Sequence, residues 1–293
     1  MAQLIYNTLR PFSNQQPGLP RLLQPYEELN GKIQNNTFQY QPSDAPNFWK
    51  DGGNLVDYTE DEMLYTTNKQ GFRGNKIVKN ETILMTAGCS HTYGIGVRDN
   101  EVWGSKLAEQ LDMYHINVGV GGIGCDSVVL IVKQFFEEGV IPDTLAVLWP
   151  SLNRKMIVSN KSKKLDDQIM DFLIEPVEKF DPFIFQFQPS NPLPNDSSII
   201  QNVKGYLLQS EQQNLLSFWM YRELLISLCK MNNVKLIEAF TEPEGRDYVT
   251  AKCNNKIPCL KTVLQDSYID YARDNLHFGI KTHSQLADSF KIL

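Results

Sequence analysis

The stretch Gly88-Cys89-Ser90-His91-Thr92-Tyr93-Gly94 follows directly on the apolar run Thr82-Ile83-Leu84-Met85-Thr86-Ala87. The apolar run is typical of a buried strand, and the two glycines allow the backbone to turn sharply on either side of the polar residues. A serine in this position presents its hydroxyl group to a ligand at the end of the strand. Ser90 is therefore a candidate nucleophile.

An acid and a base that suit this serine lie near the other end of the chain, in Asp274-Asn275-Leu276-His277. Their spacing brings a carboxylate and an imidazole within reach of each other on one turn, so serine, base and orienting acid are all available. Of the other histidines, His115 opens an apolar strand and is interpreted as structural, and His283 is given no role. His91 adjoins the serine, but neighbours in an extended chain point apart, which makes it a poor base for Ser90.

The pattern of the chain predicts an α/β fold. Four short β-like runs alternate with helical segments, and such alternation is typical of a parallel sheet covered by helices on both faces, which is a three-layer α/β/α sandwich. The predicted strands are 82–87, 114–118, 145–149 and 234–239, and the predicted helices are about 100–111, 126–138, 211–232 and 280–291.

Two segments depart from this rhythm. Residues 1–75 are rich in Asn, Gln and Pro and are predicted to form an N-terminal arm packed on a core domain of residues 76–293. The segment at about 155–210 follows the third strand, contains several prolines among aromatic residues, and is too long for a plain connection. It is interpreted as an insertion that covers the site or binds a partner, or as a packed surface excursion without a role in chemistry.

Ligands of an open parallel sheet bind beyond the carboxyl ends of its strands. The second strand is followed by Asn117-Val118-Gly119-Val120-Gly121-Gly122-Ile123-Gly124, whose amides can face a developing negative charge. The third strand is followed by Trp149-Pro150-Ser151-Leu152-Asn153-Arg154, which offers the side-chain amide of Asn153. We expect the Ser90 hydroxyl, the backbone N–H groups and this carboxamide to face one crevice.

Composition excludes several classes of protein. The 293 residues are 42% hydrophobic and 21% charged, with a net charge of −6, so nucleic acid is not an expected partner. The densest basic stretch, 161–164, is interpreted as a solvated loop. Neither a basic, apolar leader nor a run of roughly 20 apolar residues is visible, which predicts a cytoplasmic protein without membrane contact.

No cofactor or metal is expected. The five cysteines are odd in number and lack Cys-x-x-Cys spacing; Cys253 and Cys259 could bridge in a secreted protein, but free thiols are expected. Residues 119–124 fit Gly-x-Gly-x-x-Gly, yet the acid required at the end of the next strand is absent, because Asp143 lies at its start. Thr92 breaks the Gly-x-Ser-x-Gly pattern of the α/β-hydrolases.

Together these motifs resemble the SGNH (GDSL) hydrolase superfamily, which has a flavodoxin-like α/β/α sandwich. The stretch 88–94 is similar to its first block, 117–122 to its second and 274–277 to its Asp-x-x-His block; 68–74 resembles a segment often found upstream of the serine. The resemblance implies nucleophile Ser90, base His277, orienting acid Asp274, and an oxyanion hole made by Ser90, Gly122 and Asn153. It also implies an esterase acting on acetyl or other short acyl groups, with a carbohydrate or small-molecule ester as substrate.

Two departures from the family pattern leave an alternative open. Cys89 replaces the usual Asp before the serine, and 149–153 lacks the Gly-x-Asn-Asp motif. If one donor to the oxyanion were lost with that motif, hydrolysis would be slower by roughly 10²- to 10³-fold. The alternative is a non-catalytic binding or structural protein on the same fold, associated with a virion. In that case the N-terminal arm and the insertion would be docking surfaces in an oligomer or larger assembly.

Overall fold

A computed structural model gives the architecture. It describes residues 37–38, 63–68, 70–79, 81–159, 183–187, 211–241, 247, 269–274 and 276–291. The predictions that concern Cys253 and Cys259, and most of the N-terminal arm and of the insertion, lie outside these ranges.

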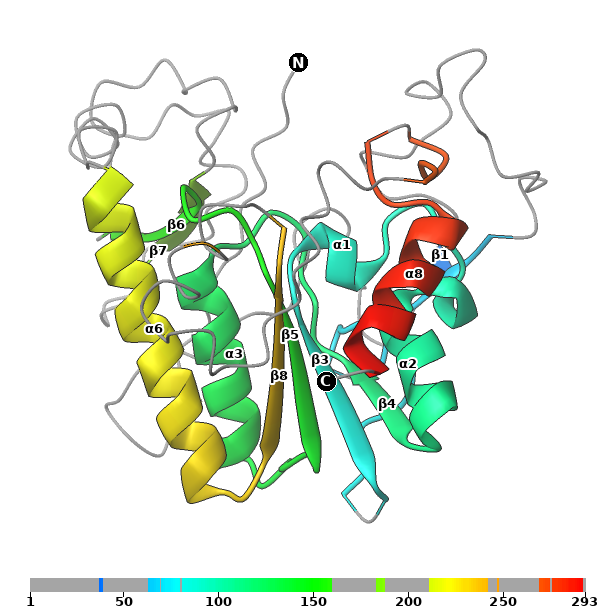
Figure 1. Cartoon of the computed structure of the whole chain (residues 1–293), viewed down its shortest axis with the longest axis horizontal. Coiled ribbons are helices and arrows are strands. Elements are labelled where there is room, and N and C mark those ends of the chain that lie inside the picture. The colour runs from blue at the N-terminus through cyan, green and yellow to red at the C-terminus, as the bar shows by residue number, and fades with distance from the viewer. Residues whose placement is uncertain are drawn as a thin grey trace.

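A four-stranded parallel sheet forms the centre of the molecule (Figure 1). Its strands are β3 (Ile83–Gly88), β4 (Tyr114–Asn117), β5 (Thr144–Trp149) and β8 (Lys235–Phe240), in the order β4-β3-β5-β8. Every residue of the central strands β3 and β5 is buried, as expected where helices cover both faces of a parallel sheet. The predicted fold class is confirmed, and each of the four strands begins and ends within two residues of its predicted bounds.

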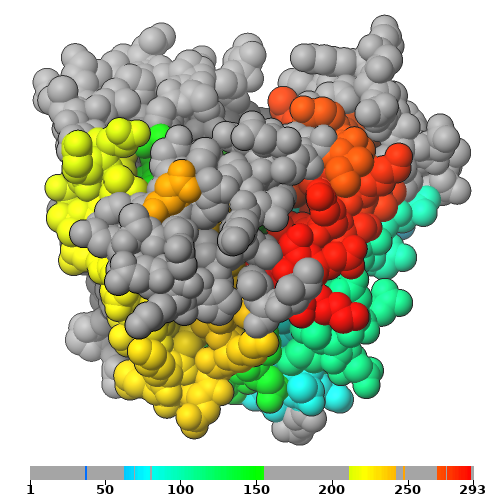
Figure 2. Space-filling model, viewed as in Figure 1, coloured from blue at the N-terminus to red at the C-terminus, as the bar shows by residue number. Residues whose placement is uncertain are grey.

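Two pairs of helices cover the two faces of the sheet (Figure 1). Helices α3 (Cys125–Glu137) and α6 (Glu211–Met231) pack together on one face. Helices α2 (Trp103–Leu111) and α8 (Ile280–Lys291) pack together on the other, where the rings of Trp103 and Phe290 stack with centroids 4.7 Å apart. Figure 2 shows α6 in yellow and α8 in red on opposite sides of one face of the molecule. Each face of the sheet therefore has its own apolar core.

Two small two-stranded sheets lie outside the central one. Strands β1 (Thr37–Phe38) and β2 (Tyr65–Thr66) pair antiparallel, as do β6 (Lys155–Ser159) and β7 (Phe183–Phe187). The second pair falls within the predicted insertion after the third strand. No helix in the described ranges is both long and apolar enough to cross a membrane.

Candidate active site

The chain turns sharply where β3 ends. Cys89 is extended and buried, and Ser90 is the first residue of the one-turn helix α1 (Ser90–Tyr93). We expected an extended backbone here; the chain is instead helical from Ser90 onward. Gly88 makes the turn possible because a Cβ at that position would lie 2.6 Å from the carbonyl oxygen of Leu148 on β5. The serine is thus held at the carboxyl end of a central strand.

Ser90 is positioned but not engaged by its surroundings. The residue is 7% exposed. Among the residues that the structure describes, neither its hydroxyl group nor its backbone N–H forms a hydrogen bond. Both groups are therefore available to a ligand.

Asp274 and His277 form the pair that the sequence predicts. Asp274 Oδ2 lies 2.5 Å from His277 Nδ1, and Asp274 Oδ1 accepts hydrogen bonds from the backbone N–H groups of Leu276 and His277, both at 3.0 Å. Burial alone would raise the pKa of the Asp274 carboxyl, but the hydrogen bonds and charge of His277 outweigh it, and this pKa is lowered. The carboxylate therefore stays ionised and fixes the orientation of the ring, which is 14% exposed.

The Asp274–His277 segment lies at the same end of the sheet as α1 (Figure 1). The ring centroid of His277 is 5.1 Å from that of His91, and the Phe278 ring stacks on His91 at 3.9 Å. Burial, followed by the charges of His277 and Arg154, lowers the pKa of His91 well below its usual value. The His91 ring is thus uncharged and lies where the serine turn approaches the Asp274–His277 segment. No hydrogen bond joins Ser90 directly to His277 within the described residues.

The glycine loop after β4 docks onto α1 through Asn117. This side chain donates to the carbonyl oxygen of Thr92 at 2.9 Å and accepts from the backbone N–H of Gly119 at 2.8 Å. Gly119 lies against α1 so closely that a Cβ would be 2.5 Å from the backbone nitrogen of Tyr93. Gly122 follows at φ 77°, and its N–H has no hydrogen bond among the described residues. Asn117 thus connects the predicted oxyanion loop to the serine turn.

The loop after β5 carries Asn153 and Arg154. Asn153 is exposed; its Oδ1 accepts a hydrogen bond of 2.8 Å from Nδ2 of Asn214 on α6. That contact orients the amide, whose Nδ2 has no acceptor in the described part of the chain. The next residue, Arg154, has Nε and Nη1 buried without a hydrogen-bond partner. Within the described ranges, this loop therefore carries donors that no acceptor uses.

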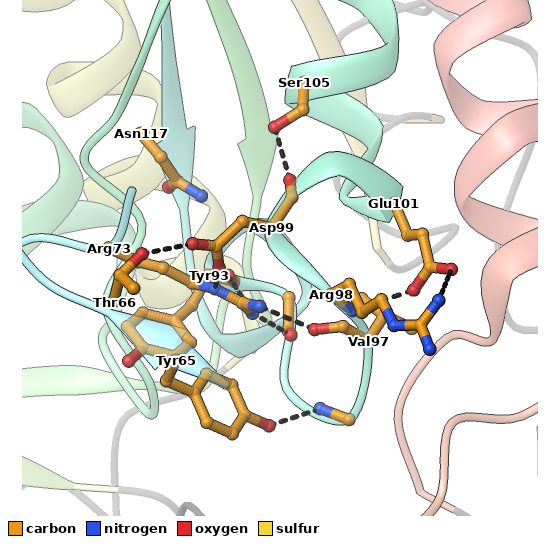
Figure 3. Close-up of polar contacts among 12 residues, drawn as sticks. Tyr65, Thr66, Arg73, Tyr93, Val97, Arg98, Asp99, Glu101, Ser105 and Asn117 are labelled. Atoms are coloured by element: carbon orange, nitrogen blue, oxygen red, sulfur yellow. Dashed lines mark hydrogen bonds and ion pairs between the residues drawn. The ribbon is translucent and has the colours of Figure 1, made fainter. Parts of the chain in front are cut away.

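Arg73 holds the segment that follows the serine turn (Figure 3). Its guanidinium donates to the carbonyl oxygens of Tyr93, Gly94 and Val97, and to Asp99 Oδ1 at 2.5 Å. Burial alone would lower the pKa of Arg73, but the carboxylate of Asp99 and the hydroxyl groups of Tyr65 and Tyr93 together outweigh burial, and this pKa is raised. No role of Arg73 is predicted from the sequence, although this residue lies in the stretch 68–74 that resembles an upstream family segment. That resemblance was the available signal.

The contacts of His115 and His283 are structural, and the sequence predicted this role for His115. Its ring nitrogens contact the hydroxyl groups of Thr86 at 2.8 Å and Ser105 at 3.0 Å, and burial lowers its pKa to about 3. His283 accepts a hydrogen bond of 3.1 Å from the Trp103 backbone N–H and is completely buried.

A cavity of about 390 Å³ lies beside α2 and β4, away from the serine. Its walls include Arg73, Asp99, His115 and Asn117, but neither Ser90 nor His277. The polar side chains of Arg73, His115 and Asn117 already form hydrogen bonds within the protein. In the described residues no group of histidine, cysteine and carboxylate side chains could hold a metal ion. The candidate site is therefore the region around Ser90.

No protein-family model and no curated protein matches the sequence. Solved structures similar to the chain include a lipolytic protein of the G-D-S-L family from Desulfitobacterium hafniense, at 12% identity and a TM-score of 0.42, covering 72% of this chain and 98% of that one. An esterase from Pseudoalteromonas sp., at 12% identity and a TM-score of 0.37, covers 71% of this chain and 93% of its own.

An acetyl xylan esterase from Butyrivibrio proteoclasticus is similar at 14% identity and a TM-score of 0.35, covering 75% of this chain and 64% of that one. All of these structures are similar to the chain at low identity and with TM-scores below 0.5. These identities and TM-scores do not establish an activity, which has to be derived from the site.

Proposed function

We propose that the protein is a serine ester hydrolase that removes acetyl or other short acyl groups from a carbohydrate or related ester. The observation that carries the proposal is the 2.5 Å contact between Asp274 and His277, on a segment whose imidazole lies 5.1 Å from the ring of His91, the neighbour of Ser90. Nucleophilic catalysis requires a base that is oriented by a carboxylate and comes within hydrogen-bond reach of the serine. The Asp274–His277 pair supplies the oriented base, at the end of the sheet where Ser90 lies (Figure 1).

The proposed mechanism starts with the proton on the serine. Because His277 Nδ1–H donates to Asp274, Nε2 is the atom left to accept the Ser90 hydroxyl proton as Oγ attacks the ester carbonyl carbon. The tetrahedral oxyanion would receive hydrogen bonds from the backbone N–H groups of Ser90 and Gly122 and from Asn153 Nδ2. The C–O bond to the alcohol then breaks, and the leaving alkoxide takes the proton from His277. Water, deprotonated by His277, hydrolyses the acyl-serine and regenerates Ser90.

Replacing the nucleophile is the direct test. The Ser90→Ala variant should fold normally and lose hydrolysis of 4-nitrophenyl acetate by at least about 10³-fold, since removing a catalytic serine has effects of this size or larger. The Ser227→Ala variant, which changes an exposed serine on α6, is the matched control and should keep full activity. Undiminished hydrolysis by Ser90→Ala would remove Ser90 from the mechanism.

A fluorophosphonate probe separates this proposal from the non-catalytic binding or structural role. Stoichiometric labelling that is confined to Ser90, mapped by peptide mass spectrometry, supports an enzyme. Folded protein that takes up no label at all would favour the binding role.

A further inference from the structure

The ring of His91 contacts two consecutive residues of the segment that carries the candidate base. It stacks on the Phe278 ring, with centroids 3.9 Å apart and an angle of 18° between the planes, and its centroid lies 5.1 Å from that of His277. His91 is the second residue of α1 and directly follows Ser90. One side chain of the serine turn therefore contacts the segment that holds Asp274 and His277.

Phe278 gives this stack a firm base. It is completely buried, and its ring meets that of His283 on α8 edge to face, with centroids 5.8 Å apart. A backbone hydrogen bond holds the same segment in shape, because the Ala272 N–H donates to the carbonyl oxygen of His277 at 2.9 Å. Removing the His91 ring would thus take support from an ordered segment on the side of the serine turn.

The two segments also touch at Gly96, beyond the end of α1. A Cβ at this glycine, whose φ is 82°, would lie 2.5 Å from Cβ of Ala272. The Gly96 N–H donates to the hydroxyl oxygen of Tyr65 at 2.7 Å, which fixes the loop at that point. Contacts at Gly96 and at His91 therefore determine how the serine turn packs against the Asp274–His277 segment.

The His91 ring is uncharged near neutral pH. Burial, followed by the charges of His277, Arg154 and His283, holds its pKa well below the usual value. A positive charge at position 91 would repel the imidazolium that forms on His277 during the proposed hydrolysis. The contacts of His91 with Phe278 and His277 are ring contacts, so a neutral aromatic ring of similar size can provide them.

We propose that His91 is a positioning residue, whose ring holds the segment carrying Asp274 and His277 against the turn carrying Ser90. This inference rests on the proposed ester hydrolysis for its catalytic consequence. A displacement of about 1 Å in a catalytic site can cost roughly 10²-fold in rate, so a small shift of the segment matters. Because the ring acts through the base and not on the substrate, its loss is expected in kcat and not in KM.

The His91→Ala variant removes the ring and should lower kcat for 4-nitrophenyl acetate by roughly 10- to 100-fold, with KM changed by less than about 3-fold. His91→Phe restores a neutral ring and should keep kcat within about 3-fold of the wild type. His115→Ala is the matched control, because it removes a buried imidazole that contacts Thr86 and Ser105, and it should keep full kcat. Full kcat in His91→Ala, a loss confined to KM, or no recovery in His91→Phe would overturn the proposal.

Phe278→Leu provides the same test from the other side of the stack. It keeps an apolar side chain in the core but removes the ring on which His91 stacks, so kcat should fall as in His91→Ala. Circular dichroism verifies the fold of each variant. A folded Phe278→Leu variant with wild-type kcat would contradict the role of the stack.

Hydrogen exchange keeps the test independent of catalysis. The N–H groups of Ala272 and His277 donate to the carbonyl oxygen of His277 and to Asp274 Oδ1, respectively, and both bonds slow exchange. In the Ser90→Ala background, adding His91→Ala should speed exchange of these two groups by at least about 10-fold, since local opening becomes easier when packing is lost. Adding His91→Phe instead should leave the exchange rates as they were.

The two experiments separate the two proposals. Unchanged exchange on adding His91→Ala would show that His91 does not hold the segment, whatever the activity. If exchange responds as expected but the wild type hydrolyses no ester, ester hydrolysis is the part that fails.

Discussion

Two arginines near the end of the sheet have opposite surroundings. Arg73 is 1% exposed and donates to three carbonyl oxygens and a carboxylate, whereas Arg154 has two buried nitrogens without an acceptor. The first arginine holds the segment that follows Ser90 in place, and its charge is compensated by the fold. The second is compensated by nothing within the described residues. The contrast separates a side chain that holds the site together from one whose buried donors have no acceptor in the described part of the chain.

The largest expected effect concerns the oriented base, without which neither arginine matters to catalysis. Asp274→Asn keeps the size of the side chain but favours the wrong tautomer of His277, so kcat should fall by roughly 10⁴-fold. The measurement is steady-state hydrolysis of 4-nitrophenyl acetate, with circular dichroism to verify the fold. An Asp274→Asn variant with near wild-type kcat would show that His277 does not act through this carboxylate.

Unfolding experiments test the contrast between the two arginines. Arg73→Met removes the donors to the segment 93–97 and leaves Asp99 without its cationic partner, so the free energy of unfolding should fall by about 3 kcal/mol. Arg154→Met should change it by less than about 0.5 kcal/mol, or stabilise the protein, because the two buried nitrogens form no hydrogen bond with the residues that the structure describes. Urea denaturation of both variants provides the values. Equal destabilisation by the two changes would contradict the distinction.

Asn153 tests whether donors on the loop after β5 act in catalysis. If its Nδ2 binds the oxyanion, Asn153→Ala should lower kcat by roughly 10²-fold with little change in KM. Asn214→Ala removes only the partner that orients this amide and should cost less than about 10-fold. A reduction confined to KM would place Asn153 in ground-state binding.

The smallest effect concerns acid stability. The pKa of His115 is about 3 in the folded protein, against roughly 6.5 when unfolded, so between these values the unfolded state binds the extra proton. The contribution of His115 to the free energy of unfolding is therefore fully present above about pH 6.5. It decreases by about 1.4 kcal/mol for each pH unit below that value. His115→Gln should show a shallower loss between pH 6.5 and pH 5 in urea unfolding; an unchanged slope would contradict the prediction.

The sequence predicted most of the framework because local patterns determine it. The central strands are continuous apolar runs bounded by turns, and they alternate with helical segments, so the predicted bounds are close to those observed. The Asp274–His277 contact was also predictable, since both residues lie on one turn.

What the sequence left open depends on contacts between remote segments. Nothing in the letters around Arg73 indicates that it reaches the carbonyl oxygens of 93–97, and nothing around Arg154 indicates that its nitrogens are buried without partners. The helical start at Ser90 was missed for a related reason: the turn depends on Gly88 packing against β5. Asn117 was noted only as the first residue of a glycine-rich loop, not as its anchor.

The packing of α8 on α2 has a consequence for how the protein is made. Ser90 follows the first strand of the central sheet, whereas His277 lies just before α8, whose Phe290 and His283 contact Trp103. A nascent polypeptide emerging from the ribosome therefore carries its serine turn long before the imidazole exists. If Ser90 reacts only with the help of His277, reactivity at Ser90 would indicate that the segment carrying His277 has been made and that α8 has packed on α2.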